Sequence, residues 1–306
     1  MPRILAIGQL VVDVVVHPVT HLPQDGEAAI VEPLYFTMGG CALNTAVVLD
    51  RLGVTVGLCG LLGSDWGGRC VREMLEGTGV DLSAVKDTKD WSTTSSVVLV
   101  EPDGQRSFFH HPGAAAHLTV ADIPEAALAA AEVIVVSGLT KLASLDVLAL
   151  FRHIGKLGKR LVVDVDYEPS GDWQEAFERC LPYIDVFVPS WDEAHTISGE
   201  REPAQMVRYF RDRGASWVGI KRSDQGCYLD TGDTVVEVPA IKVPVVDTTG
   251  AGDAWVGGFA AGYIWGWKPQ EIARLANACG AMAVTSVGAT TGIGNLAQAR
   301  HLMTKI

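Results

Sequence analysis

Short runs of branched apolar residues alternate along the chain with stretches in which apolar residues recur at helical spacing. Runs with the composition of strands cover residues 4–8, 56–62, 133–137, 161–165, 185–188 and 217–220. Helical spacing covers residues 41–52, 66–76, 145–157, 174–181, 203–213, 251–265 and 269–284. This alternation predicts a mostly parallel sheet with helices on both of its faces.

Two segments, residues 14–36 and 92–111, interrupt the alternation. The first is rich in valine, proline and turn residues and has no helical spacing. The second contains two predicted strands, 95–100 and 106–110, joined by a turn sequence at residues 101–105. Extended segments inserted into an α/β scaffold can pair into a small sheet over a substrate crevice. We therefore expect these two segments to form a lid.

Composition and charge narrow the class of protein. Of the 306 residues 48% are hydrophobic and 20% are charged, which is sufficient for a packed core without disulfides or metals. The formal net charge of -12 repels nucleic acid and anionic lipid, so neither is an expected partner. Six scattered cysteines without a CxxC pair, and no signal-peptide pattern, predict a cytoplasmic protein with reduced thiols. Without a long linker or a repeat, we expect a single domain over residues 1–306.

The sharpest chemical motif is DTTGAGDAWVGGF at residues 247–259, which opens a predicted helix. The small residues Gly250, Ala251 and Gly252 let a ligand approach the backbone closely. The unpaired amides of a helix start also attract an anion. Asp253, beside this anion hole, is placed to take a proton from a hydroxyl that attacks a γ-phosphate. A helix cap and a turn would explain a bare GAGD, but the longer string is more specific.

Two further motifs share a family pattern with this one. GGCALNTA occupies residues 39–46, and the tail at residues 286–292 reads SVGATTG. Together the motifs resemble the ribokinase-like (PfkB) carbohydrate kinase family over the whole chain, in particular uncharacterised bacterial sugar kinases with this tail. The resemblance implies a three-layer α/β/α sandwich with a mostly parallel central sheet and a small β-sheet lid. It also implies phosphorylation of a hydroxyl of a small sugar or polyol by ATP and Mg²⁺, with Asp253 as general base.

The resemblance assigns substrate binding to Asp13, Gly39, Gly40, Asn44 and Arg106. Asp13 follows the first predicted strand, where a carboxylate can accept hydrogen bonds from two hydroxyl groups. The glycine pair would let a substrate lie against bare backbone. Asn44 can donate to one hydroxyl and accept from another. Taken without the resemblance, Arg106 is a solvated strand arginine.

The predicted nucleotide site departs from the family pattern at two positions. Ser190 stands where the family has the Asn of Asn-x-x-Glu, whereas Glu193 matches the glutamate that organises Mg²⁺ through water. Ser223 replaces the first glycine of the family motif Lys/Thr-x-Gly-x-x-Gly, in which Lys221 and Gly226 are kept. We expect Ser190, Lys221, Ser223 and Gly226 to bind the nucleotide. The two serines leave the nucleotide preference open.

Many members of the family bind a monovalent cation beside the anion hole, so the resemblance implies a K⁺ site. Its candidate ligands are Asp247, Thr249 and the loop that contains Ser286 and Gly288. Asp164, at the end of a predicted strand, is expected near the transferred phosphoryl group. For Asp164, a metal or electrostatic role and a structural role in a turn are both open.

Two other functions stay open at this stage. A nucleoside kinase of the same fold would need an apolar cradle for its base, which Phe36, Phe108 and Phe109 could supply. A nucleotide- or sugar-binding sensor without catalysis is disfavoured by Asp253 but favoured by the two serine departures. No GxxxxGK[ST], GxSxG or HExxH motif points to another class of enzyme. Exposed edges of the lid strands predict a homodimer through the lid.

Overall fold

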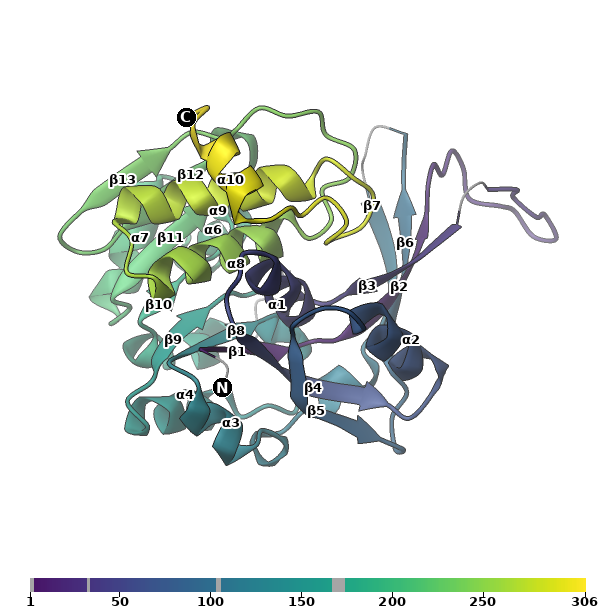
Figure 1. Cartoon of the computed structure of the whole chain (residues 1–306), viewed down its shortest axis with the longest axis horizontal. Helices are drawn as coiled ribbons and strands as arrows, with labels where there is room; N and C mark the ends of the chain where they lie inside the picture. Colours follow the sequence, from purple (N-terminus) through teal and green to yellow (C-terminus); the bar gives the residue numbers. More distant parts are fainter. Residues whose placement is uncertain (1–2, 32–33, 103–105, 167–173) are drawn as a thin grey trace.

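The computed structural model describes residues 3–31, 34–102, 106–166 and 174–306 (Figure 1). Within these residues, nine strands form one sheet in the order β13-β12-β11-β10-β9-β8-β1-β4-β5. Its strands are β1 (Ile4–Gly8), β4 (Val56–Gly63), β5 (Asp81–Thr88), β8 (Val133–Ser137), β9 (Arg160–Val163), β10 (Val186–Phe187), β11 (Trp217–Lys221), β12 (Cys227–Asp230) and β13 (Val235–Val238). Neighbours from β5 to β11 run parallel, and β12 and β13 add an antiparallel edge.

Helices cover both faces of this sheet because alternate strand residues point to opposite sides. Ile4 and Ala6 of β1 enter one apolar core, and Leu5 and Ile7 enter the other. The first core is covered by α1 (Cys41–Arg51), α2 (Trp66–Leu75), α8 (Ala251–Ile264), α9 (Pro269–Ala283) and α10 (Leu296–Met303). The second is covered by α3 (Glu125–Ala130), α4 (Val147–Lys156), α5 (Gln174–Glu178), α6 (Trp191–Ser198) and α7 (Pro203–Asp212). The predicted three-layer α/β/α sandwich is confirmed.

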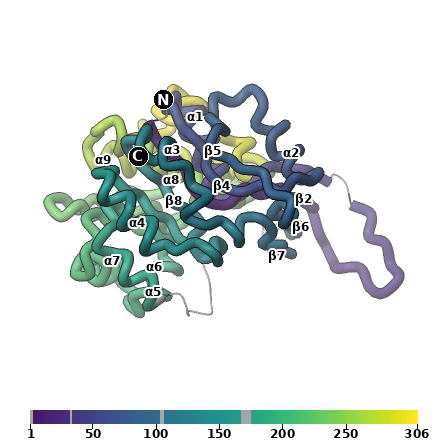
Figure 2. Tube along the Cα trace, turned by 90° about the horizontal axis from the view of Figure 1, so that it is seen from below, coloured from purple at the N-terminus to yellow at the C-terminus, as the bar shows by residue number. Residues whose placement is uncertain are grey.

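A separate four-stranded sheet in the order β3-β2-β6-β7 stands beside the body of the molecule (Figures 1 and 2). Its strands are β2 (Val11–Val16), β3 (Leu34–Gly39), β6 (Thr94–Val100) and β7 (Arg106–His111). The two segments that interrupt the strand–helix alternation thus pair with each other, as expected for a lid. The segment between β2 and β3 projects away from both sheets in Figure 2. Most of the expected hairpin turn, residues 103–105, lies outside the described residues.

The sequence pattern missed several elements and misplaced one side chain. Strands β5, β12 and β13 and helices α3, α6 and α10 were not predicted, because each is at most eight residues long and too short to show a clear hydrophobic period. The predicted helix at 174–181 ends at Glu178 and continues as a short 3-10 turn. Asp13 follows β1 along the chain, as expected, but it lies within β2 of the lid and not in a loop at the end of β1.

The cysteines are free thiols, and four of the six are buried. Across the described parts of the chain, we find no helix with the length and apolar character that a membrane crossing requires.

Candidate active site

Asp253 lies in the first turn of α8, half-buried, with its carboxylate facing α1. Asn44 Nδ2 donates a hydrogen bond to Asp253 Oδ2 at 2.8 Å, and Thr45 Oγ1 donates to the Asp253 carbonyl at 3.3 Å. Burial raises the pKa of Asp253 above its ordinary value, although the bond from Asn44 and the charge of Lys221 oppose the rise. A carboxylate with a raised pKa in a protected position is suited to accept a proton.

The turn before Asp253 leaves two amides unpaired. Gly250 caps α8 with φ 72°, a conformation that favours glycine, and a Cβ there would overlap Ala289. The Ala251 amide donates to the Thr248 carbonyl at 3.3 Å. Within the described chain, the amides of Gly252 and Asp253 have no acceptor. These two amides, at the positive end of the helix dipole, are the ones available to an anion.

Gly252, unlike Gly250, lies inside helix α8 and does not have the positive φ that favours glycine. A Cβ at Gly252 would meet one described atom within 4 Å, Lys221 Nζ at 3.6 Å. Packing against the protein therefore does not require glycine at this position. The bare backbone and the nearby ammonium instead frame a small space suited to a phosphoryl group.

The Asn44 side chain joins the two family motifs. Asn44 is 4% exposed, and its Oδ1 has no hydrogen-bond partner among the described residues. Buried polar atoms are rarely left unpaired in a folded protein. Because Nδ2 is engaged by Asp253, the free Oδ1 is an acceptor for a hydroxyl of a ligand.

Four polar side chains form a row across the lid sheet. Asp13 pairs with Thr37 on one side and Ser96 on the other, and Ser96 pairs with His110. Ser96 hydrogen-bonds to the Asp13 carboxylate, and its Oγ lies 3.1 Å from His110 Nδ1. Burial, with a smaller contribution from the charge of Asp253, raises the pKa of Asp13 to about 6, although the hydrogen bond from Ser96 opposes the rise. Asp13 and Asp253 thus influence each other across the space between lid and body.

The glycine pair before α1 is required by sterics. A Cβ on Gly39 would overlap the Asp13 carboxylate, and Gly40 has φ 95° with the Gln9 backbone against it. Gly39 therefore makes room for the Asp13 carboxylate. That the glycine pair also contacts a substrate stays a prediction of the family resemblance.

Arg106 reaches from the lid to the turn before α8. Its Nη1 donates to Thr249 Oγ1 at 2.9 Å. Thr249 Oγ1 in turn donates to Asp247 Oδ1 at 2.6 Å, and the Gly288 amide donates to Asp247 Oδ2 at 2.9 Å. The side-chain oxygens of Asp247 and Thr249 are therefore occupied by protein donors. A monovalent cation site with Asp247, Thr249, Ser286 and Gly288 as ligands stays a prediction of the family resemblance.

A buried ion pair lies on the other side of the anion hole. Lys221 Nζ donates to Asp164 Oδ1 at 2.6 Å. Burial would lower the pKa of Lys221, but Asp164 and Glu193 raise it above its ordinary value. Burial raises the pKa of both carboxyl groups, while Lys221 opposes the rise. Two buried carboxyl groups that share one ammonium would bind a divalent cation favourably, so these residues fit Mg²⁺.

A family model, described as "pfkB family carbohydrate kinase", matches residues 1–295 of this chain. The chain belongs to that family. Among curated proteins, it is 32% identical to an aminoimidazole riboside kinase of Salmonella typhimurium, over 83% of this chain and 84% of that protein. It is 28% identical to a 2-dehydro-3-deoxygluconokinase of Bacillus subtilis, over 84% and 83% of the two chains.

The fold of this carbohydrate kinase is found in solved structures. The crystal structure of aminoimidazole riboside kinase from Salmonella enterica, complexed with aminoimidazole riboside and an ATP analogue, superposes with a TM-score of 0.77. The two chains are 27% identical, and the match covers 98% of this chain and 99% of the other. The ribokinase-like resemblance stated from the motifs is thereby confirmed.

The residues predicted to bind the nucleotide gather near the carboxyl ends of β10 and β11. Ser190 caps α6, where its Oγ accepts from the Glu193 amide at 3.3 Å and its own amide donates to Glu193 Oε2 at 2.6 Å. The substitution of asparagine by Ser190 is therefore compatible with a well-formed helix start. Ser223 has φ 49°, so a serine stands in a backbone conformation that favours glycine. A Cβ on Gly226 would overlap the Val238 carbonyl, which makes that glycine structural.

The expected aromatic cradle was wrong for two of its three residues. Phe36 and Phe109 belong to the row Phe36–Val14–Val97–Phe109, which points away from the Asp13 face because successive strand residues alternate. Phe108 shares the face of Asp13, and the Arg106 guanidinium lies 5.7 Å from its ring centre.

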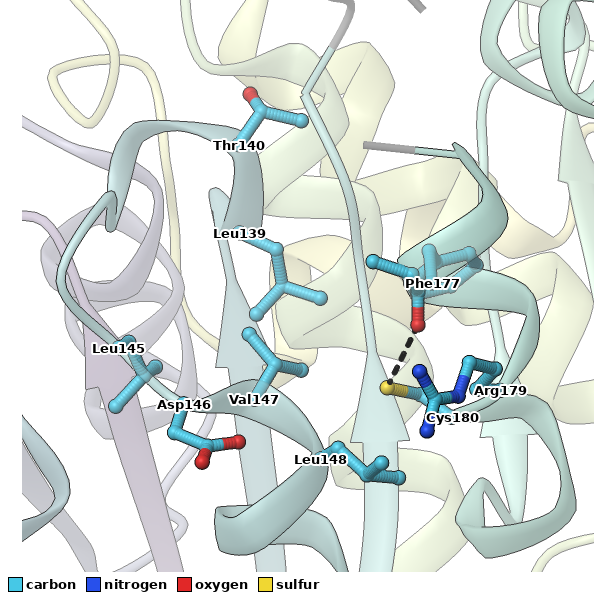
Figure 3. Close-up of a pocket in the computed structure, with 10 residues that line it drawn as sticks. Leu139, Thr140, Leu145, Asp146, Val147, Leu148, Phe177, Arg179 and Cys180 are labelled. Carbon is cyan, nitrogen blue, oxygen red and sulfur yellow. Dashed lines mark hydrogen bonds between the residues drawn. The ribbon is translucent and has the colours of Figure 1, made fainter. Parts of the chain in front are cut away.

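A well-defined hollow lies away from these residues, between the start of α4 and the end of α5 (Figure 3). Its volume is about 350 Å³, and its walls include Leu139, Val147, Leu148 and Phe177. Asp146 caps α4 and Cys180 Sγ donates to a backbone carbonyl, whereas Thr140 Oγ1 has no partner among the described residues. Because its walls are mainly apolar and offer no converging set of free polar groups, this hollow lacks the features of a sugar or nucleotide site.

Three polar residues of the site were not singled out from the sequence. Cys41 Sγ donates to Asp166 Oδ1 at 3.2 Å and also hydrogen-bonds to Asp253. Burial and the neighbouring carboxyl groups raise the pKa of the Cys41 thiol well above its ordinary value, so Cys41 is a neutral donor between two carboxyl groups. Burial also raises the pKa of Asp166 to about 6. Ser96 and His110 complete the row of Asp13. The strand alternation from Asp13 could have revealed that row, but only once the pairing of the lid strands was known.

Proposed function

We propose that this kinase transfers the γ-phosphoryl group of ATP to a hydroxyl group of a small sugar or related polyol. The observation that supports this most strongly is the Asp253 carboxylate beside the unpaired amides of Gly252 and Asp253. Bound MgATP would supply the phosphoryl group and leave as MgADP. Asp253 takes the proton of the attacking hydroxyl as the new O–P bond forms. The two amides and Lys221 hold the charge of the transferring group.

The remaining residues of the site have distinct roles in this proposal. Asp13 accepts hydrogen bonds from substrate hydroxyls, and Asn44 accepts one through Oδ1 while it orients Asp253. Glu193 and Asp164 hold Mg²⁺, with Glu193 acting through water. Ser190, Ser223 and Gly226 shape the nucleotide side. K⁺ activation stays a prediction of the family resemblance, and assays with KCl against tetramethylammonium chloride would test it.

A panel of sugars, sugar acids and nucleosides, assayed by ADP release, tests the proposal directly. Turnover on neutral sugars or sugar acids supports it. Turnover on nucleosides alone would favour a nucleoside kinase. Two observations support this alternative: Phe108 lies on the same lid face as Asp13, and the chain is 32% identical to a riboside kinase. Tight ligand binding without turnover on any compound would favour a sensor.

Substrate capture should depend on pH through Asp13. Because the pKa of Asp13 is raised to about 6, its carboxylate becomes protonated as the pH falls below that value and loses its ability to accept from two hydroxyls. We expect kcat/KM for the sugar to fall about tenfold per pH unit below pH 6.

Other acidic groups titrate in the same range, so the comparison with Asp13→Asn isolates the effect of this residue. The variant should have a low kcat/KM at pH 7.5 and a shallower decline toward pH 5. A variant whose pH profile parallels the wild type would show that Asp13 does not control substrate capture.

We also propose that the kinase is a homodimer through its lid. Phe36, Val97 and Phe109 on the outer lid face are 52%, 37% and 63% exposed, and β3 and β7 are unpaired edges of the sheet. An exposed apolar sheet face with open edges fits a second copy of the same sheet.

Light scattering should report a dimer for the wild type and a monomer for Phe109→Asp. Val235→Asp, at a 57% exposed position on the edge of the other sheet, is the matched control and should remain dimeric. A monomeric wild type at micromolar concentration contradicts this proposal.

A further inference from the structure

A directional chain of hydrogen bonds joins the lid to the turn before Asp253. Arginine can only donate, so the Thr249 oxygen accepts from Arg106 at 2.9 Å. A hydroxyl has a single proton, and Thr249 Oγ1 donates it in a hydrogen bond to Asp247 Oδ1 at 2.6 Å. The Thr249 amide donates to the same oxygen at 2.9 Å. The direction of every hydrogen bond in the chain, from Arg106 through Thr249 to Asp247, is therefore defined.

The lid contacts the same region at a second, apolar point. Val15, Val98 and Val100, on the face of the lid that carries Asp13, are each 1% exposed and pack against Val287. The next residue, Gly288, lies against the Thr37 side chain and donates its amide to Asp247 Oδ2 at 2.9 Å. The loop around Val287 thus lies between the lid and Asp247.

We propose that Arg106 is a positioning residue that acts through Thr249 to hold the anion-hole turn in its active shape when the lid is seated. This inference rests on the proposed kinase function. Thr249 directly precedes Gly250, whose left-handed conformation aims the amides of Gly252 and Asp253 at the phosphoryl space. Rotation at residue 249 would redirect those amides, so a bond that restrains Thr249 preserves the anion hole.

The position of the guanidinium distinguishes this role from direct contact with the sugar. Arg106 donates to Thr249 and lies over Phe108, and its nearest charged partners are Asp247 and Asp253. Asp13 lies on a different strand of the same sheet. A sugar bound to Asp13 would stabilise the docked lid, and the bond from Arg106 to Thr249 would then restrain the turn that forms the anion hole. The lid thereby links occupancy of the sugar site to readiness for phosphoryl transfer.

A double-mutant cycle with Arg106→Gln and Thr249→Val tests the link. Each single variant should lower kcat by about 10- to 100-fold, the effect expected for loss of one charge-assisted hydrogen bond. The double variant should be no slower than the slower single variant. The KM for the sugar should change by less than about twofold throughout. Thr249→Ser keeps the hydroxyl and should retain wild-type kcat.

Hydrogen exchange of the β7 amides gives a second readout that needs no substrate. Either single variant should raise their exchange rate by about tenfold, with no further rise in the double variant. Asp253→Asn should leave this exchange unchanged, which separates lid docking from the chemistry of the base. If the proposed kinase function is wrong, kcat cannot be measured, but the hydrogen-exchange experiment still tests whether Arg106 and Thr249 dock the lid.

Three results would overturn the inference. An Arg106→Gln variant with a raised sugar KM and an unchanged kcat would place the guanidinium on the sugar. Effects of the two substitutions that multiply in kcat, or β7 exchange that matches the wild type in both single variants, would show that Arg106 and Thr249 act independently.

Discussion

Replacing Asp253 by asparagine is expected to lower kcat by at least about 10³-fold, in the upper part of the range for loss of a general base. Asparagine has nearly the same shape and can still accept the hydrogen bond from Asn44 through its side-chain oxygen. It cannot take up the proton of the attacking hydroxyl. The measurement is steady-state ADP release, with ATP affinity followed separately by calorimetry.

The stability of the variant provides an internal check. Burial raises the pKa of Asp253, which means that the folded protein holds the charged carboxylate at a cost. A neutral asparagine removes that cost, so the melting temperature at pH 7.5 should stay the same or rise. ATP affinity should change little. Asp212→Asn, at a 69% exposed side chain on α7, is the matched control for loss of one negative charge and should keep full activity. Normal turnover by Asp253→Asn would refute Asp253 as the base.

Replacing Gly252 by alanine is expected to lower kcat by at least about 10²-fold while the protein becomes no less stable. Its new Cβ would lie 3.6 Å from Lys221 Nζ, an ordinary contact, and so would fill the space framed by the ammonium and the unpaired amides. Alanine in place of an exposed helical glycine stabilises by about 0.5–1 kcal/mol. Kinetics and thermal unfolding of the same preparation would measure both effects.

Two other glycines make this prediction specific. Gly155 lies within α4, and a Cβ there meets no described atom within 4 Å, so Gly155→Ala should stabilise the protein and leave kcat unchanged. Gly250 has φ 72° and would clash with Ala289, so Gly250→Ala should lower both stability and activity. If Gly252→Ala keeps wild-type kcat, the phosphoryl group does not bind over the Gly252 amide.

The contrast between Gly250 and Gly252 shows how far a motif can be interpreted from sequence. Both are glycines of the string at residues 247–259, and the string alone assigns both of them, with Ala251, to one anion hole. In the structure, one glycine makes a left-handed turn, one leaves space for a ligand, and the Ala251 amide is bonded to Thr248. Sequence spacing carries no information on which way an amide points.

In the lid, the sequence predicted the strands but not the face of the sheet on which each side chain lies. The two lid segments were predicted from turn residues and the loss of helical spacing, and β6 and β7 were placed within one residue at each end. The sides on which Phe36 and Phe109 lie were not predicted, since they depend on the pairing of β2 with β3 and β6. A shift of one residue in such a pairing moves every side chain to the other face.

The sequence by itself determined the α/β architecture and the family and supplied the candidate site residues, because these follow from local periodicity and from motifs of consecutive residues. Only the tertiary structure decided which of those residues face one another. The bond between Asn44 and Asp253 spans 209 positions, and the bond between Arg106 and Thr249 spans 143. Contacts at such separations arise from the packing of whole elements, which local patterns do not encode.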